Sequence, residues 1–137
     1  MNEESNVEAA TALYQALTAG DLPAVLGMLT DDVDLTVYGP PEVPFAGRHL
    51  GRDGVAAFFE TVARHTSRPE AHHVPEIEEL IAQGDKVVAI GVDRVLARDT
   101  ERPYDGWWVH VLEFRGGKVA RIREYIDTAT AREMFAV

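Results

Sequence analysis

The first half of the chain places apolar residues at the three- and four-residue spacing of amphipathic helices. Three helices are predicted, with apolar stripes Ala10, Leu13, Tyr14 and Leu17; Leu22, Val25, Leu26 and Leu29; and Val55, Phe58, Phe59 and Val62. Ser5 and Glu8 match the capping box that starts a helix, and Gly20 provides the left-handed residue that ends one. Asp21 is placed to cap the second helix, and Ser67-Arg68-Pro69 should end the third.

The period changes to two residues from position 32, which indicates strands. A first strand alternates Val33, Leu35 and Val37 with polar residues. Four more strands are predicted at about residues 71–82, 86–97, 104–115 and 118–127, and Asp127 can cap a short last helix. Residues 39–51 are expected to form a loop. Helices followed by a long antiparallel meander predict an α+β fold whose helices pack on one concave sheet face.

Composition indicates one globular domain over residues 1–137, because 46% of the residues are hydrophobic and 26% are charged. The chain has no cysteine, which excludes disulfides and thiolate metal sites. A net charge of −10 disfavours binding to nucleic acid or to an anionic membrane surface. There is no apolar stretch of the roughly 20 residues that a membrane span requires, and no export signal, so a cytoplasmic location is the default expectation.

The last hairpin decides which side chains share a face, because a slip of one residue exchanges the two faces of a strand. A three-residue loop, Gly116-Gly117-Lys118, places His110 opposite Glu124. A two-residue loop would instead pair His110 with Arg123 and scatter charge over both faces. We therefore expect the three-residue loop.

In this register His110 and Glu124 are the ionisable residues of an otherwise apolar face. The apolar members of that face are Trp108, Leu112, Phe114, Ala120, Ile122 and Ile126. An acid and an imidazole among apolar side chains are typical of a pocket wall. The opposite face carries Trp107, Val109, Val111, Glu113, Arg121, Arg123 and Tyr125, a mixture suited to solvent or to a partner subunit.

The order of the predicted helices and strands, together with four short segments, resembles a known family. The segments are Ala19-Gly20-Asp21-Leu22, Leu50-Gly51-Arg52-Asp53-Gly54-Val55, Gly117-Lys118-Val119 and Arg123-Glu124-Tyr125-Ile126-Asp127. Together they resemble the SnoaL-like and ketosteroid-isomerase-related proteins of the nuclear-transport-factor-two-like superfamily, over nearly the whole chain. The resemblance implies a cone-shaped barrel: a curved antiparallel sheet with three N-terminal-half helices on its concave face and a short C-terminal helix. It also implies a homodimer formed through the outer sheet face.

The resemblance implies which residues are candidates for catalysis. An acid of the SnoaL-type polyketide cyclases falls on Glu124, and their histidine falls on His110. The catalytic aspartate of limonene epoxide hydrolases also falls on Glu124, but their Arg-x-Asp falls on Gly91-Val92-Asp93, where the arginine is missing. The general base of ketosteroid isomerase falls near Val37. Its oxyanion-hole tyrosine falls near Leu13, with Tyr14 adjacent, and its oxyanion-hole aspartate falls on His110. None of these mechanisms transfers intact.

The sequence thus predicts a cofactor-free general acid–base enzyme of the isomerase, cyclase or hydrolase type, acting on a small, largely apolar molecule. The catalytic candidates are Glu124, His110 and Asp93, and the predicted pocket-lining residues are Trp108, Tyr14, Val37, Leu112, Ile122 and Ile126. If Asp93 faces the cavity, repulsion between two carboxylates would leave one of them protonated; otherwise Asp93 pairs with a surface arginine. The alternatives are a non-catalytic small-molecule binder and an interaction module with a vestigial pocket.

A metal site is not expected. His72 and His73 are adjacent and would point to opposite faces of a strand, and no third ligand stands at a suitable distance from them or from His49. There is also no glycine-rich phosphate loop and no nucleophile motif.

Overall fold

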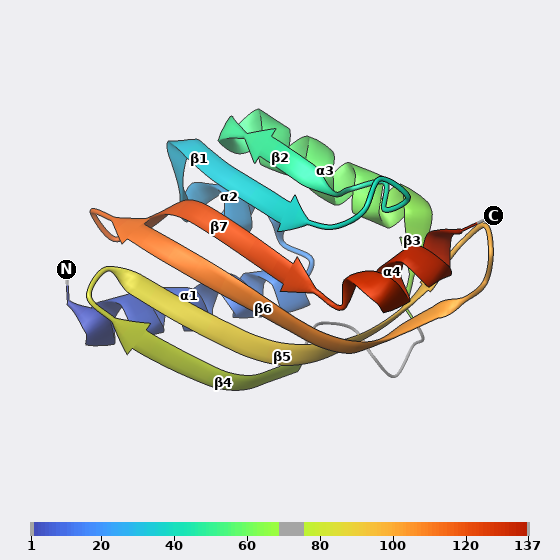
Figure 1. Ribbon diagram of the computed structural model, residues 1–137. Coiled ribbons are helices and arrows are strands. Elements are labelled where there is room, and N and C mark those ends of the chain that lie inside the picture. The colour runs from blue at the N-terminus through green and yellow to red at the C-terminus, as the bar shows by residue number, and fades with distance from the viewer. Residues whose placement is uncertain (1, 69–75, 137) are drawn as a thin grey trace.

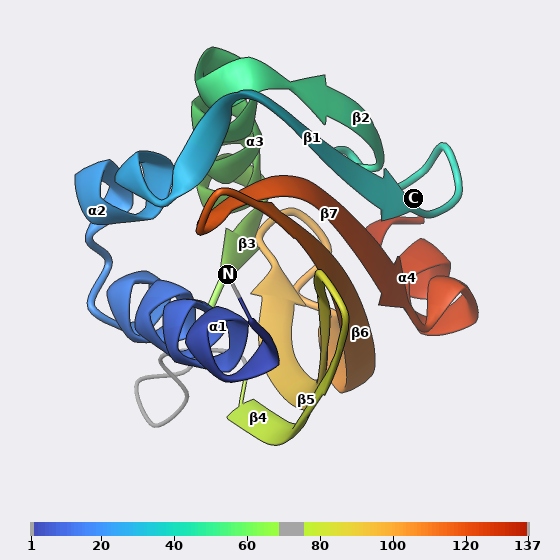
Figure 2. The same cartoon turned by 90° about the vertical axis from the view of Figure 1, so that its left-hand side faces the viewer.

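A strongly curved sheet forms the body of the protein. The computed structural model describes residues 2–68 and 76–136. Its strands are β1 (Leu29–Tyr38), β2 (Gly47–Leu50), β3 (Thr66–Ser67), β4 (Glu76–Gln83), β5 (Lys86–Ala97), β6 (Pro103–Arg115) and β7 (Lys118–Ile126), as Figure 1 shows. The helices are α1 (Glu3–Thr18), α2 (Leu22–Gly27), α3 (Gly51–His65) and α4 (Thr128–Phe135). Figure 2 shows the first three helices across the concave side of the sheet and α4 at one end, which confirms the predicted α+β architecture.

The sheet is mixed rather than wholly antiparallel. Its order is β2-β1-β7-β6-β5-β3, with β4 also paired to β5. Strand β1 runs parallel to β7, with Leu35 beside Ile122 and Val37 beside Glu124, whereas the other pairs are antiparallel. The expectation of an antiparallel sheet was wrong for this pair, because alternation of apolar residues marks a strand but not its direction.

Side-chain caps account for most of the predicted helix boundaries. Asp21 Oδ1 accepts a hydrogen bond from Ala24 N at 3.2 Å, and Gly20 adopts φ +68° directly before it, as predicted. Asp127 likewise caps α4. The capping box at Ser5 was wrong: α1 begins a turn earlier, because Asn2 Oδ1 accepts from Ser5 N at 2.8 Å.

Two short strands occur where none was predicted. Residues 47–50, expected in a loop, form β2 against β1, and Thr66–Ser67 pair with Leu96 and Ala97 of β5. The predicted strand from residue 71 is observed from Glu76, and positions 71–75 lie outside the described residues. The two-residue β3 matters for the site, because it fixes the backbone directly before Arg68.

The last hairpin has the predicted pairing but not the predicted loop. His110 lies opposite Glu124, as expected. The turn, however, has two residues: Arg115 pairs with Lys118 around Gly116-Gly117, whose φ values are +60° and +82°. Positive φ at both central residues gives the turn the twist that suits adjacent strands, and glycine adopts it without strain.

A β-bulge reconciles this tight turn with the pairing of His110. Phe114 pairs with Val119, whereas Glu113 pairs with Arg121, so Ala120 has no partner opposite it. The extra residue shifts the register by one position. The bulge thereby restores the pairing that a two-residue turn alone would lose.

No helix within the described residues is both long and apolar enough to cross a membrane.

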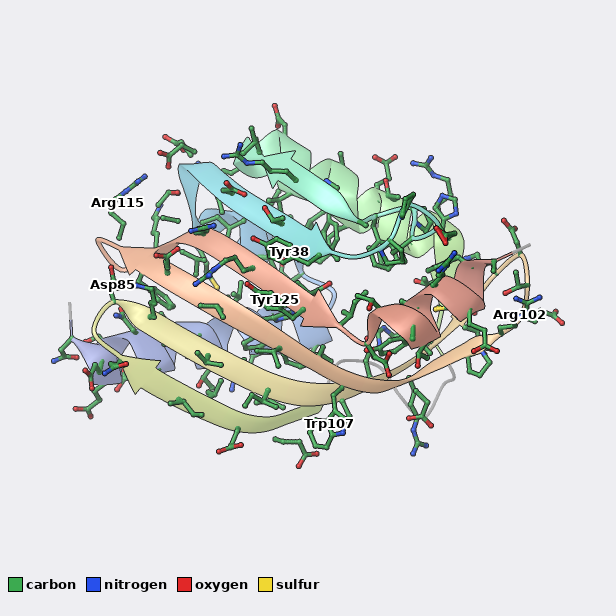
Figure 3. The ribbon with its side chains drawn as sticks, viewed as in Figure 1. Tyr38, Asp85, Arg102, Trp107, Arg115 and Tyr125 are labelled. Carbon is green, nitrogen blue, oxygen red and sulfur yellow. The ribbon has the colours of Figure 1, made fainter. Side chains whose placement is uncertain are left out.

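The convex face of the sheet exposes aromatic side chains. Tyr38 and Tyr125 stack there with ring centroids 4.8 Å apart, and Trp107 is 58% exposed. Figure 3 shows all three on the sheet, on the side away from the helices. Exposed aromatic surface on a sheet marks an interaction site.

We propose that a second copy of the chain covers this convex face. Light scattering should then give twice the mass of one chain at two protein concentrations, and Trp107→Asp should lower the mass toward that of one chain at the lower concentration. A single-chain mass for the unmodified protein at both concentrations would contradict the proposal.

The turn glycines also make a testable contribution to stability. Alanine at Gly116 must adopt φ +60° with no atom crowding its Cβ, so Gly116→Ala should lower the free energy of unfolding by about 1 kcal/mol. Gly27→Ala is the matched control, because its Cβ also meets open space but the backbone there has no positive φ. Urea denaturation followed by circular dichroism measures both, and an equal loss in the two variants would exclude the backbone as the cause.

Candidate functional site

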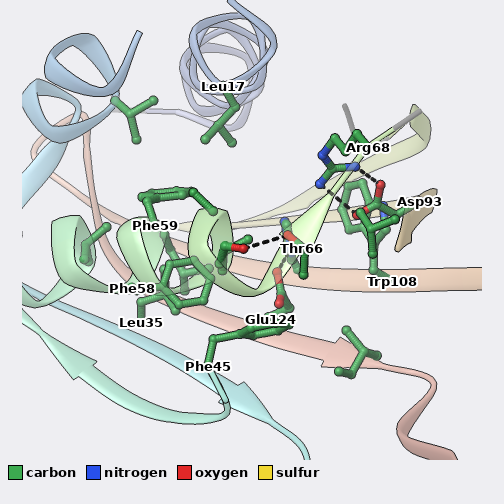
Figure 4. A pocket seen from close by; sticks show the side chains of 18 of the residues that line it. Leu17, Leu35, Phe45, Phe58, Phe59, Thr66, Arg68, Asp93, Trp108 and Glu124 are labelled. Carbon is green, nitrogen blue, oxygen red and sulfur yellow. Dashed lines mark hydrogen bonds and ion pairs between the residues drawn. The ribbon is translucent and has the colours of Figure 1, made fainter. Parts of the chain in front are cut away.

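The concave side of the sheet encloses an apolar cavity. Its volume is about 730 Å³, within the range of small-molecule sites. The sheet contributes Trp108, Leu112, Ile122 and Ile126 to the wall, α3 contributes Phe58 and Phe59, and α4 contributes Met134. Figure 4 shows Leu17 of α1 and Phe59 of α3 at the same cavity. This lining is suited to a largely apolar ligand.

Three side chains form a hydrogen-bonded chain at the wall. His110 Nε2 lies 2.5 Å from Glu124 Oε1, and His110 Nδ1 lies 2.7 Å from Tyr14 Oη. The His110 and Glu124 side chains are 12% and 20% exposed, and Tyr14 is buried. His110 of β6 has Glu124 of β7 as its neighbour on one strand and Ala89 of β5 as its neighbour on the other. Tyr14 reaches His110 from α1.

The Tyr14 phenol stays protonated in this hydrogen-bonded chain. Burial, and secondarily the negative charge of Glu124, raise the pKa of the Tyr14 phenol. The phenol therefore keeps its proton and can donate a hydrogen bond to Nδ1 of a neutral His110. A neutral imidazole that accepts at Nδ1 carries its proton on Nε2, which donates to the Glu124 carboxylate. Tyr14 thus sets the tautomer of His110, and His110 holds one oxygen of Glu124.

Aromatic packing fixes the ring of His110. The ring lies 4.2 Å from Trp108 and 5.8 Å from Tyr14, measured between centroids. Trp108 in turn stacks against Tyr14 at 5.9 Å. Three rings that contact one another leave the imidazole little freedom to rotate, so Glu124 is presented to the cavity in a fixed orientation.

Asp93 faces the same cavity but carries its own counterion. Its carboxylate forms a two-pronged ion pair with Arg68: Nη1 bonds to Oδ1, and Nη2 bonds to Oδ2 at 3.0 Å. Asp93 Oδ1 also accepts from Arg94 N at 2.9 Å. Within the described part of the chain, Asp93 has no hydrogen bond with Glu124. Since Arg68 offsets the charge of Asp93, the two carboxylates are not a pair sharing one proton.

Strand geometry also separates these two carboxylates. Asp93 lies four residues along β5 from Ala89, the residue opposite His110. At about 3.3 Å per residue this offset is roughly 13 Å between backbone positions. The Glu124 group and the Arg68–Asp93 pair therefore lie at different places along the cavity, as Figure 4 shows.

The structure corrects two expectations about single residues. Val37 of β1 is fully buried but is not among the residues that line the cavity. It packs in the main hydrophobic core. Arg68, which we expected merely to end α3, lines the cavity instead. Only the pairing of β3 with β5 brings it to Asp93, and no local pattern in the sequence signals that pairing.

The described histidines outside the site form no metal centre. His49 Nε2 lies 2.9 Å from the carbonyl oxygen of Phe45. Across residues 2–68 and 76–136 there is no cluster of three or more potential metal-ligating side chains. His72 and His73 lie outside the described residues.

Residues 10–122 match the family model of the SnoaL-like domain. The chain belongs to this family. A comparison with curated proteins found no match to the SnoaL-like chain. An NTF2-like protein of unknown function from Burkholderia pseudomallei is 28% identical, with a TM-score of 0.85 and full coverage of both chains.

Two less similar structures show the same fold. TerC, co-crystallised with polyporic acid, is 24% identical with a TM-score of 0.81, covering 97% of this chain and 99% of its own. A protein from Xanthomonas campestris provisionally named as a polyketide cyclase is 19% identical with a TM-score of 0.76, covering 99% of this chain and 100% of its own. The SnoaL-like chain therefore shares its cone-shaped fold with them.

The raised pKa of Tyr14 predicts how stability responds to alkaline pH. An unfolded tyrosine loses its proton near pH 10, whereas folded Tyr14 keeps it, so the free energy of unfolding should fall as pH rises above about 10. Burial raises the pKa of Tyr104 as well, so its contribution remains in a Tyr14 variant. Tyr14→Phe should make the decrease between about pH 10 and 12 less steep.

Urea denaturation at a series of pH values measures this slope. Tyr38→Phe, which removes an exposed hydroxyl group, is the matched control. An unchanged slope in Tyr14→Phe would mean that the phenol ionises as readily in the folded protein as in the unfolded chain.

Proposed function

We propose that this SnoaL-like protein is a cofactor-free acid–base catalyst of the isomerase, cyclase or hydrolase type, acting on a small, largely apolar organic molecule. The observation that supports it is the Tyr14–His110–Glu124 chain, which ends at the wall of an apolar cavity of about 730 Å³. An oriented carboxylate in apolar surroundings is suited to take a proton from a bound substrate.

Glu124 acts as the base through the oxygen that His110 does not hold. This oxygen accepts a proton from an acidic C–H of the substrate, or from a water molecule in a hydrolase. The protonated carboxyl group then returns the proton to another atom. In an isomerase that atom is a second carbon, and in a cyclase it is the oxygen of the carbonyl group that the carbanion attacks.

His110 and Tyr14 position the base rather than touch the substrate. The N–H of His110 holds Glu124 Oε1 at 2.5 Å, and the phenol of Tyr14 fixes the imidazole tautomer that makes this possible. Holding a catalytic group in its reactive geometry lowers the entropic cost of the reaction. Loss of Tyr14 therefore acts on Glu124 through His110.

Two solved relatives of this fold are consistent with the proposal. TerC was crystallised with an organic ligand, polyporic acid, and the Xanthomonas protein carries the provisional name of a polyketide cyclase. The alternative function is a non-catalytic binder that uses the same cavity. A catalyst and a binder differ in whether a bound carbon acid exchanges its protons.

Exchange of a carbon-bound hydrogen with solvent tests the proposal without knowledge of the natural substrate. In D₂O, the protein should accelerate loss of the α-proton signals of 2-tetralone in ¹H NMR spectra. Glu124→Gln removes the base but keeps the size of the side chain, so we expect the acceleration to fall by about 10²- to 10⁴-fold. The dissociation constant for 2-tetralone should change little.

Glu113→Gln is the matched control. Glu113 lies on the same hairpin but does not line the cavity, and it pairs with Lys86 and Arg121. This variant should exchange the α-protons at the rate of the unmodified protein. Binding of 2-tetralone without any accelerated exchange would support the binder and contradict the catalyst.

A further inference from the structure

The proposed proton transfer gives no role to the Arg68–Asp93 ion pair of the cavity lining. Arg68 and Asp93 both line the cavity, and their side chains are 29% and 17% exposed. Partial burial removes hydration from both charges, and the attraction between them offsets this desolvation cost only in part. The place of the pair in a largely apolar wall therefore points to a ligand that contacts it.

Arg68 retains hydrogen-bond donors beyond those that Asp93 uses. A guanidinium has five N–H donors, and the two bonds to Asp93 engage one on each terminal nitrogen. No further hydrogen bond joins Arg68 to another described residue. Asp93 accepts from Arg68 and from Arg94 N, and a carboxylate has room for an additional donor. The pair thus offers both a donor and an acceptor to a bound molecule.

The charges around the pair indicate which ligand group fits. Asp93 already offsets the charge of Arg68, and Glu124 adds a further negative charge to the same cavity wall. A carboxylate on the ligand would be a third anion beside Arg68, which is unfavourable in a largely apolar cavity. Arg98, the other arginine of the lining, is exposed to water and donates to the carbonyl oxygen of Ala63. A hydroxyl group adds no charge, accepts a bond from Arg68 and donates one to Asp93.

The position of the pair indicates where the ligand carries this group. Asp93 and the residue opposite His110 are four positions apart on β5, an offset of roughly 13 Å along the strand. Trp108 lies on the cavity wall between them, since it pairs with Gly91. One ligand can therefore contact both polar positions only if an apolar, ring-sized body separates its two functional ends.

We propose that the substrate carries a neutral hydroxyl group, bound by Arg68 and Asp93, at the end remote from the atom that Glu124 deprotonates. This inference extends the proposed function to a substrate class: hydroxylated molecules with an aromatic or alicyclic body. The hydroxyl site itself is a property of binding, so it can be tested with compounds that have no acidic C–H.

The test compares three probes that differ in one group: 4-phenylphenol, biphenyl and biphenyl-4-carboxylate. Isothermal titration calorimetry, with the protein in the syringe, should show that 4-phenylphenol binds at least about tenfold more tightly than the other two, because a hydrogen bond to a charged group strengthens binding by that factor or more. Arg68→Met should raise the dissociation constant for 4-phenylphenol about tenfold and leave that for biphenyl within about twofold.

Asp93→Asn provides an independent variant, since it leaves Arg68 with an uncompensated charge. It should strengthen binding of biphenyl-4-carboxylate relative to 4-phenylphenol. Arg64→Met is the matched control, because Arg64 is an exposed arginine of α3 that does not line the cavity. If circular dichroism shows that Arg68→Met is unfolded, Arg68→Lys and Asp93→Asn carry the comparison.

Three results would overturn the inference: unchanged 4-phenylphenol binding in folded Arg68→Met, equally tight binding of the carboxylate and the phenol to the unmodified protein, or no binding of any probe. These outcomes are separate from the failure of the proposed function. Proton exchange from 2-tetralone tests Glu124 alone, whereas biphenyl and its derivatives report only on the cavity and on Arg68.

Discussion

The register of the β6–β7 hairpin is the constraint on which the site depends. A strand presents alternate residues to opposite faces, so a shift of one position would turn His110 or Glu124 out of the cavity. The bulge at Ala120 compensates for the two-residue Gly116-Gly117 turn and keeps the two side chains opposite each other. Backbone geometry some distance from the cavity therefore decides whether the cavity contains a carboxylate that His110 holds.

The site also ties helix α1 to the sheet. Tyr14 comes from the buried stripe of α1, and its hydroxyl group forms a hydrogen bond with His110 of β6. A buried hydroxyl that lost this partner would cost about 1–3 kcal/mol. The Tyr14–His110 hydrogen bond thus couples the packing of α1 to the orientation of Glu124, so a change that loosens the helix also disturbs the proposed base.

The sequence was most informative where side-chain pattern and turn chemistry agree. Helical stripes, Asp21, Asp127 and the pairing of His110 with Glu124 follow from local rules. The pairing was nevertheless derived through a loop that does not occur, because a three-residue loop and a two-residue turn with a bulge displace the register equally. Sequence alternation cannot distinguish these two backbones.

What the sequence did not reveal depends on contacts between distant segments. Val37 packs in the hydrophobic core and does not line the cavity, and the short β3 places Arg68 beside Asp93. Comparison with limonene epoxide hydrolases identified a missing arginine two residues before Asp93. The structure supplies an arginine to Asp93 from the residue directly after β3, 25 positions earlier in the chain.

Asp93 influences Glu124 through Arg68, although no hydrogen bond joins these two described carboxylates. Arg68 is a cation on the wall of a cavity that also contains the proposed base, and a cation beside a carboxylate stabilises its charged form and weakens it as a base. By holding both terminal nitrogens of Arg68, Asp93 keeps that cation away from Glu124. Glu124 is then held by Nε2 of His110, which orients it. The cavity can in this way contain an arginine for binding and a carboxylate for proton transfer, because each has a separate partner.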